Sequence, residues 1–135
     1  MLSLSCHCGA VRVAVARRPD FIHQCNCSLC SKTGARWGYY DPAEVEIGGA
    51  TAGYVRRDKA EAGARTHFCP VCGATTHFRL TEAAAERHGD TMCGVNMALA
   101  DPADLAGVEL RFPDGRAWDG DGPFTYVRPA EVIGG

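Results

Sequence analysis

The sequence lacks the long apolar runs that would indicate a membrane protein. No stretch of the chain approaches the roughly 20 apolar residues that a membrane-spanning helix needs. The N-terminus, Met1-Leu2-Ser3-Leu4-Ser5, also lacks the charged region and hydrophobic core of a secretion signal. We therefore expect no membrane partner and a cytoplasmic location, where a reducing environment disfavours disulfides.

An excess of basic charge is also missing. The formal net charge is -2, the sequence pI is about 6.2, and acidic and basic residues are interspersed. The short basic pairs Arg17-Arg18 and Arg56-Arg57 are interpreted as solvated strand ends. Without a basic patch there is no electrostatic footprint for phosphates, and we expect no nucleic-acid partner.

Strong helical patterns are scarce, which favours a mainly β fold. Thr81–His88 is rich in alanine and glutamate but has no large apolar face, and Asp101–Leu105 predicts one capped turn. Short β-like segments recur between turn signals. A chain of 135 residues fits one core, so we expect a single domain over residues 1–135. The expected strands are Val11–Val15, Trp37–Tyr40, Val45–Ile47, Tyr54–Arg57, Arg65–Phe68, Thr75–Leu80, Met92–Leu99 and Val108–Phe112.

Cysteine, in contrast, is abundant and clustered. Seven of the eight cysteines fall in three motifs: Cys6-His7-Cys8-Gly9, Cys25-Asn26-Cys27-Ser28-Leu29-Cys30 and Cys69-Pro70-Val71-Cys72-Gly73. Closely spaced cysteines in a turn direct their sulfurs at one ion, and a following glycine lets backbone N–H groups face the thiolates. The pattern predicts zinc binding.

A redox function is the main alternative for a C-x-x-C motif. A thioredoxin-like motif opens a helix within a βαβ pattern. The Cys69 to Cys72 motif instead lies between β-like segments and is accompanied by two more cysteine clusters. This context favours metal over redox chemistry.

Seven ligands do not divide into two complete four-ligand sites. One ion is left with an open position, which distinguishes catalytic from structural zinc, unless Cys93 completes its shell. On a strand Cys93 shares a face with Val95 and Met97, and a free cysteine packs well among apolar side chains. We therefore favour a core position for Cys93.

The order of the motifs carries a family resemblance. The sequence C-x-C, C-x-C-x-x-C, C-P-x-C-G, together with Cys8-Gly9-Ala10-Val11 and with Gly34-Ala35 after Cys30, resembles the glutathione-dependent formaldehyde-activating enzyme family, which includes centromere protein V-like proteins. The likeness spans about Cys6 to Asp101. It implies a β-tent of layered antiparallel sheets with zinc knuckles.

The resemblance also implies the assignment of ligands to two zinc ions. The structural zinc would be bound by Cys6, Cys8, Cys69 and Cys72. The second zinc would be bound by Cys25, Cys27 and Cys30, with its fourth position free for a substrate sulfur or water.

The activity implied by the resemblance is that of a zinc-dependent carbon-sulfur lyase. Such an enzyme joins formaldehyde to glutathione, giving S-hydroxymethylglutathione, or cleaves a similar thiol adduct, so the expected partner is a small thiol. The alternative is a non-catalytic, zinc-stabilised binding or scaffold module, as in the centromere-associated relative. The chain lacks the long basic extension expected of a chromatin role, which favours the enzyme.

Some residues near the second motif are candidates for the reaction itself. His23, two residues before Cys25, is the nearest candidate for moving a proton, the alternative being a packing histidine; His7 is expected to point away from the metal. Lys32 and Arg36 are candidates for binding substrate carboxylates. Trp37, Tyr39 and Tyr40 are candidates either for the pocket wall or for the core, while Trp118, Phe124 and Tyr126 are expected to cover the core.

Overall fold

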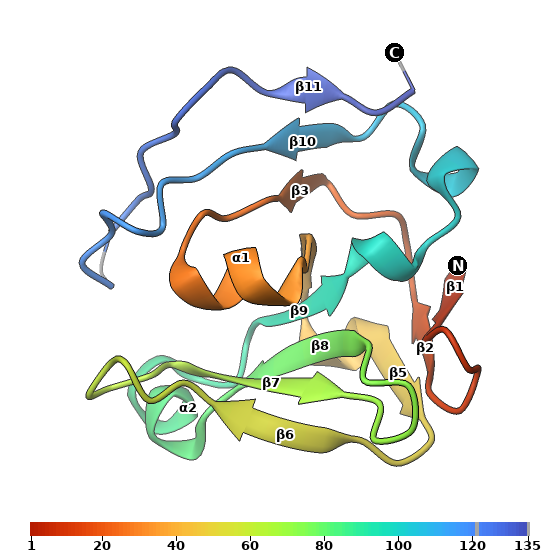
Figure 1. Ribbon diagram of the computed structural model, residues 1–135, viewed down its shortest axis with the longest axis horizontal. Coiled ribbons are helices and arrows are strands. Elements are labelled where there is room, and N and C mark those ends of the chain that lie inside the picture. Colours follow the sequence, from red (N-terminus) through yellow and green to blue (C-terminus); the bar gives the residue numbers. More distant parts are fainter. Residues whose placement is uncertain (121, 135) are drawn as a thin grey trace.

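The computed structural model describes residues 1–120 and 122–134 and contains two β-sheets (Figure 1). The smaller sheet is antiparallel and has the strand order β1-β2-β5. Its strands are β1 (Leu2–Ser5), β2 (Arg12–Val15) and β5 (Val45–Gly48). The prediction of a mainly β, layered fold is confirmed, and the prediction of a single domain over residues 1–135 stays a prediction.

The larger sheet has the strand order β11-β10-β3-β4-β9-β8-β7-β6. Six of the seven neighbouring pairs in this sheet are antiparallel, while β10 and β3 run parallel, so the sheet is mixed rather than antiparallel throughout. The sequence analysis does not predict β1, β3 or β11. The strands are β3 (Phe21–His23), β4 (Trp37–Tyr40), β6 (Ala52–Val55), β7 (Ala64–Phe68), β8 (Thr75–Leu80), β9 (Cys93–Asn96), β10 (Glu109–Arg111) and β11 (Glu131–Val132).

Two short α-helices connect the strands. The helix α2 (Glu82–His88) lies within the predicted helical segment, whereas α1 (Ser28–Thr33) is not predicted. Cys27 begins α1 in an unusual way, because its sulfur accepts a hydrogen bond from the Cys30 N–H where a serine or aspartate oxygen is usual. Gly34 ends it in the left-handed conformation. Single 3-10 turns occur at η1 (Pro42–Glu44), η2 (Met97–Leu99) and η3 (Pro102–Leu105).

The 3-10 turns modify two of the sequence predictions. Asp101 caps η3 by accepting from the Ala103 N–H, as predicted. The strand expected over Met92–Leu99 ends at Asn96, because the Asn96 side chain accepts from the Ala98 N–H and begins η2 instead. Among the described residues, none of the helices combines the length and apolarity needed to cross a membrane.

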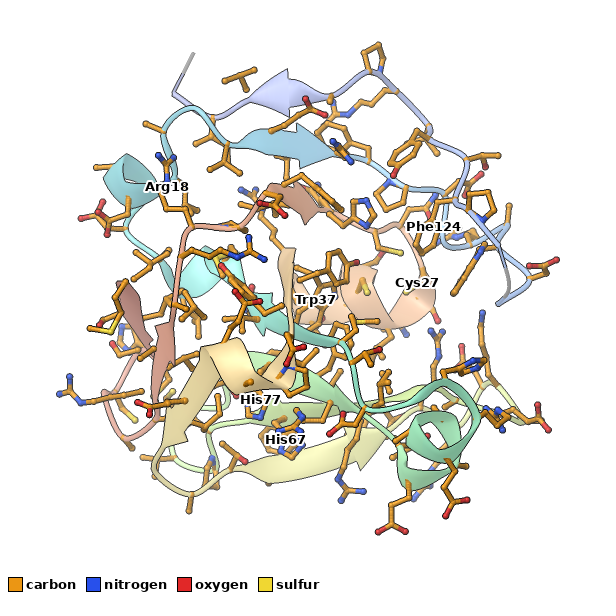
Figure 2. The ribbon with its side chains drawn as sticks, turned by 180° about the vertical axis from the view of Figure 1, so that it is seen from behind. Arg18, Cys27, Trp37, His67, His77 and Phe124 are labelled. Atoms are coloured by element: carbon orange, nitrogen blue, oxygen red, sulfur yellow. The ribbon has the colours of Figure 1, made fainter. Side chains whose placement is uncertain are left out.

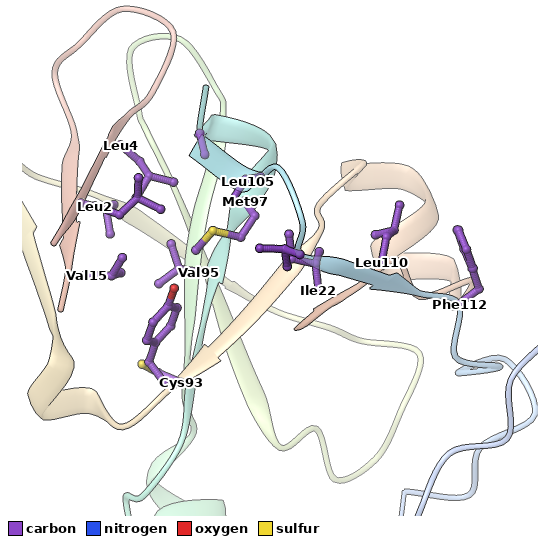
Figure 3. Packing of buried hydrophobic residues seen from close by; sticks show 14 residues of the cluster. Leu2, Leu4, Val15, Ile22, Cys93, Val95, Met97, Leu105, Leu110 and Phe112 are labelled. Carbon is purple, nitrogen blue, oxygen red and sulfur yellow. The ribbon is translucent and has the colours of Figure 1, made fainter. Parts of the chain in front are cut away.

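The main core lies where the two sheets meet. Leu4 and Val15 of the smaller sheet pack with Val95 and Met97 of the segment β9-η2 (Figure 3). Cys93 belongs to this core with 2% of its surface exposed, and burial raises the pKa of its thiol to about 11. The prediction that Cys93 packs in the core is therefore confirmed.

A second, smaller cluster packs beside α1. The Trp37 and Phe78 rings meet edge to face with centroids 4.9 Å apart. Gly94 of β9 makes room for this pair, because a Cβ atom at Gly94 would overlap the Phe78 ring. The absence of a side chain at Gly94 therefore lets the Trp37 and Phe78 rings pack beside Cys30.

A pair of histidines connects β7 and β8. His67 and His77 are cross-strand neighbours whose rings stack in parallel, with centroids 4.4 Å apart (Figure 2). Their Nδ1 atoms form hydrogen bonds with the hydroxyls of Thr51 and Thr76, respectively. Burial, followed by the charges of His67 and Arg79, lowers the pKa of His77 to about 4.

Replacing Gly94 tests the packing of the aromatic cluster. Gly94→Ala is expected to lower the free energy of unfolding by about 1 to 3 kcal/mol, the usual cost of forcing an extra methyl group into a filled core. Gly63→Ala is the matched control, because a Cβ atom there meets nothing within 4 Å. Denaturant unfolding of both variants measures the difference; equal stabilities would contradict the close packing of Phe78 on Gly94.

The buried histidine predicts a pH-dependent stability. In the unfolded chain His77 takes up a proton near pH 6.5, whereas in the fold it stays neutral down to about pH 4. Stability is therefore lost as the pH falls through this window. His77→Gln is expected to reduce the loss between pH 7 and pH 5.5 by about 1 kcal/mol. The control is His88→Gln at an exposed site; the same acid sensitivity in wild type and His77→Gln would show the prediction to be wrong.

Candidate metal centres

Four cysteine sulfurs converge where the turn between β1 and β2 meets the turn between β7 and β8. The Cys8 sulfur lies 3.7 Å from that of Cys6 and 3.6 Å from that of Cys69, and the Cys72 sulfur completes the group. A tetrahedral zinc site with Zn–S bonds of about 2.3 Å has S···S edges of about 3.8 Å. The four sulfurs thus already have the spacing that one zinc ion requires.

Backbone N–H groups surround these sulfurs. The Val11 N–H donates to Cys6 Sγ at 3.2 Å, and the Val71 N–H donates to Cys69 Sγ at 3.4 Å. Gly9 and Gly73 have φ angles of 81° and 80°, which lets the chain fold back after each cysteine pair. The Val11 N–H lowers the pKa of Cys6, so the turns favour the thiolate form that a metal binds.

The four-sulfur group of Cys6, Cys8, Cys69 and Cys72, called the closed group below, is partly shielded from solvent. Cys6 and Cys69 are buried against Val11, while Cys8 is exposed. His7 is exposed and lies outside the group of possible ligands, as expected for a residue between two ligands.

The second group, called the three-sulfur or open group below, contains three sulfurs at the beginning of α1. The ligand atoms of Cys25, Cys27 and Cys30 lie within 4.8 Å of one another. Within residues 1–120 and 122–134, no fourth histidine, cysteine or acidic side chain joins them. Cys27 is buried and the other two are half-buried, so the group is reached from one side.

Side-chain donors from other elements also contact the three sulfurs. Trp37 Nε1 of β4 donates to Cys30 Sγ at 3.4 Å, and the Arg56 guanidinium, after β6, donates to Cys27 Sγ at 3.8 Å. Hydrogen bonds with Cys25 and Cys30, and further ones from the Cys30 N–H and Arg56, hold the pKa of Cys27 far below its ordinary value. Hydrogen bonds with Cys25 and then with Cys27, followed by burial, raise the pKa of Cys30. A bound cation would stabilise all three thiolates.

Arg56 is held in place by a small network. Its guanidinium makes two bonds of 2.7 Å to the Asp58 carboxylate and one of 3.1 Å to the Ser28 hydroxyl. The Ser28 hydroxyl in turn donates to Asp58 at 3.0 Å. Sequence analysis interprets Arg56 as a solvated strand end; in the structure it joins the β6–β7 loop to the first turn of α1.

A cavity of about 490 Å³ lies beside the three-sulfur group. Cys25 and Cys30 form part of its wall, together with Arg36, Phe112 and Arg128. The two arginines come from opposite parts of the sequence, so the pocket exists only after the C-terminal segment has folded back. Ionised guanidinium groups make this wall cationic.

His23 lies near the group but is not one of its members. Its Nδ1 atom forms a 3.0 Å hydrogen bond with Tyr39 Oη, and its Nε2 atom forms a 3.1 Å bond with Tyr126 Oη. Burial, followed by the charge of Arg111, lowers the pKa of His23 to about 4, so the ring is neutral at ordinary pH. Its catalytic role stays a prediction, now with both nitrogens engaged by tyrosines.

The predicted carboxylate-binding residues separate in the structure. Arg36 lines the cavity, whereas Lys32 is exposed on α1 and is not among the lining residues. Of the three candidate aromatics, Trp37 and Tyr39 pack beside Cys30, but Tyr40 lies in the main core and donates to the Arg17 carbonyl.

The C-terminal aromatics cover His23 rather than the main core. The Phe124 ring meets the His23 ring edge-on with centroids 5.5 Å apart, and Trp118 packs against Phe124. Tyr126 donates to or accepts from His23 and is half-exposed. The expectation that these residues cover the core is corrected, because the segment after β10 passes over the beginning of α1 (Figure 2).

Comparisons with known proteins agree with this architecture. A family model described as glutathione-dependent formaldehyde-activating enzyme matches residues 1–109. A Halomonas elongata protein named for the same family is 35% identical over 83 residues, which cover 55% of this chain and only 53% of that protein, about half its length. A crystal structure of a Rhodobacter sphaeroides protein superposes with a TM-score of 0.60 and 28% identity, covering 79% of this chain and 97% of the other.

The family match extends over both cysteine groups described above. It includes every element from β1 to the first residue of β10 and therefore most of the larger sheet. On this evidence, the chain belongs to the glutathione-dependent formaldehyde-activating enzyme family.

Proposed function

We propose that this protein is a zinc-dependent carbon-sulfur lyase that acts on glutathione or a similar thiol adduct, in the manner of an S-hydroxymethylglutathione synthase. One observation carries the proposal: a complete four-sulfur group is accompanied by a three-sulfur group that borders a pocket. The family to which the chain belongs is named for glutathione-dependent chemistry. A small-thiol reaction in the cytoplasm is part of the same proposal.

The residues fit two zinc ions with different roles. The closed group would be a structural site, because four thiolates complete a tetrahedron and leave no position for substrate. The open group would leave one position facing the pocket. A zinc ion held there by Cys25, Cys27 and Cys30 would supply a Lewis acid that lowers the pKa of a substrate thiol.

In the synthetic direction the thiol sulfur attacks the formaldehyde carbon. The S–H bond breaks, the C–S bond forms, and the carbonyl oxygen gains the electron pair and a proton. We infer that the chain Tyr39-His23-Tyr126 moves this proton; the inference is supported by its two hydrogen bonds, which connect a partly buried tyrosine beside Cys30 with a half-exposed one. Cleavage of the adduct uses the same steps in reverse.

The remaining side chains position the reacting groups. Trp37 and Arg56 each direct an N–H group at a sulfur, which fixes the orientation of Cys30 and Cys27 and limits the charge that the three thiolates carry. Arg36, on the wall of the cavity, is the predicted partner of a substrate carboxylate.

Cysteine variants test the two roles together with the metal content. Wild-type protein is expected to contain two zinc ions per chain by elemental analysis. Cys27→Ala is expected to keep a folded domain with one zinc but to lose turnover of formaldehyde with glutathione. Cys69→Ala is expected to unfold, since structural zinc binding contributes directly to the free energy of folding.

Cys93→Ala is the matched control, because it also removes a buried thiol but not one from a cysteine group. It should keep both zinc ions and the activity. Equal unfolding of the Cys27 and Cys69 variants would favour the scaffold module instead. Protein that contains no zinc would remove the basis of the proposal.

Arg56 provides a separate test of the open group. Arg56→Met removes the guanidinium that anchors Cys27 through Ser28 and Asp58. The zinc affinity of the open site at pH 7 is expected to fall about tenfold, as is usual when a residue that orients a ligand is lost. Competition with a chelator measures this affinity. Arg57→Met, at the exposed neighbouring position, is the control and should leave it unchanged.

A further inference from the structure

The segment that follows β10 packs directly on the three-sulfur group, although it lies beyond the residues that the family model matches. Asn26, between two of the cysteines, donates from Nδ2 to Asp114 Oδ1 at 2.9 Å, and its Oδ1 accepts from the Arg116 N–H at 2.9 Å. Gly115, between these two partners, fits against the sulfur of Cys25, which a Cβ atom would overlap. The C-terminal segment is therefore part of the site.

The same segment supplies one wall of the cavity. Phe112 and Arg128 of this segment line the cavity together with Arg36. The Arg128 guanidinium lies over the Phe112 ring at 3.7 Å from its centroid, which holds the charge in place. Its contact with Glu131, at 3.7 Å between exposed side chains, is too loose to neutralise it.

The charge of the wall indicates what the cavity binds. None of the described residues that line it is acidic, whereas two are arginines. Guanidinium groups bind carboxylates through paired, charge-assisted hydrogen bonds. Because Cys25 and Cys30 line the same cavity, a molecule with a sulfur at the open group would present its other end to this cationic wall.

We propose that Arg128, from the C-terminal segment, acts with Arg36 as the specificity-determining residue that selects thiols carrying a carboxylate. This inference rests on the proposed function and names the substrate class of the same site. It also assigns the selection to a residue outside the stretch that is matched by the family model. The recognition is by charge, so it should extend to carboxylated thiols other than glutathione.

The test compares two pairs of thiols, one member of each pair carrying free carboxylates and the other not: glutathione with its diethyl ester, and mercaptoacetate with 2-mercaptoethanol. Isothermal titration calorimetry on the zinc-loaded full chain measures the affinities for glutathione, for its diethyl ester and for uncharged 2-mercaptoethanol. Wild-type protein is expected to bind glutathione about tenfold more tightly than the diester, the usual effect of a charge-assisted pair. Mercaptoacetate should show a similar preference over 2-mercaptoethanol.

Variants then assign the preference to Arg128. Arg128→Gln is expected to reduce the preference for glutathione over its diethyl ester to about threefold or less, since one guanidinium remains. Arg128→Lys should retain an intermediate ratio. Arg87→Gln, on the exposed side of α2, removes a guanidinium elsewhere and should keep the wild-type ratio. Thermal melting of each variant verifies that it is folded.

The possible failures are distinguishable. The inference is overturned, while the proposed function stands, if thiols bind but wild-type protein has nearly equal affinities for glutathione and its diethyl ester. The same conclusion follows if Arg128→Gln keeps the full wild-type preference for glutathione over the diester. If no thiol binds to the zinc-loaded protein, the proposed function and the inference are both overturned.

Discussion

The convergence of four sulfurs between two turns is the constraint on which the rest of the structure depends. Cys6 and Cys8 lie in the turn between β1 and β2 of the smaller sheet, and Cys69 and Cys72 lie in the turn between β7 and β8 of the larger one. Cys8 and Cys69, whose sulfurs are in contact, are 61 residues apart in the sequence. Packing between the sheets is provided by the main core, in which Leu4 and Val15 contact Val95 and Met97. A zinc ion bound by the four sulfurs, as we propose, would join the two turns and add its binding free energy to that of folding.

The second cysteine group has three sulfurs where the first has four, and this difference is why we propose a different role for it. Its three sulfurs are positioned by α1, which begins at one of them, and are supported by donors from β4 and from the loop after β6. The elements that surround the group are thus spread across the sheet. An open position toward a pocket follows from this arrangement, because the side without a ligand is left to the C-terminal segment.

The segment after β10 completes the site from outside the stretch that the family model matches. The family match ends at residue 109, yet Phe112, Val127 and Arg128 line the cavity and Phe124 covers His23. A wall that is built from outside the shared stretch can change without disturbing the thiolates. Under the proposal for Arg128, a change in this wall would alter which thiols bind while the three sulfurs stay as they are.

The sequence by itself determined the features that depend on local spacing. Cysteine pairs in tight turns followed by glycine indicated metal ligands, and the period-two pattern placed Cys93 in the core, because both depend on residues a few positions apart. It did not reveal α1, whose N-cap is a cysteine rather than an oxygen-bearing residue. Only the tertiary structure decided which motifs bring their sulfurs together, that Arg56 reaches Cys27, and that Arg128 lines the pocket with Arg36. These are contacts between segments far apart in the chain, and neither spacing nor propensity encodes them, since they arise only when the strands have paired.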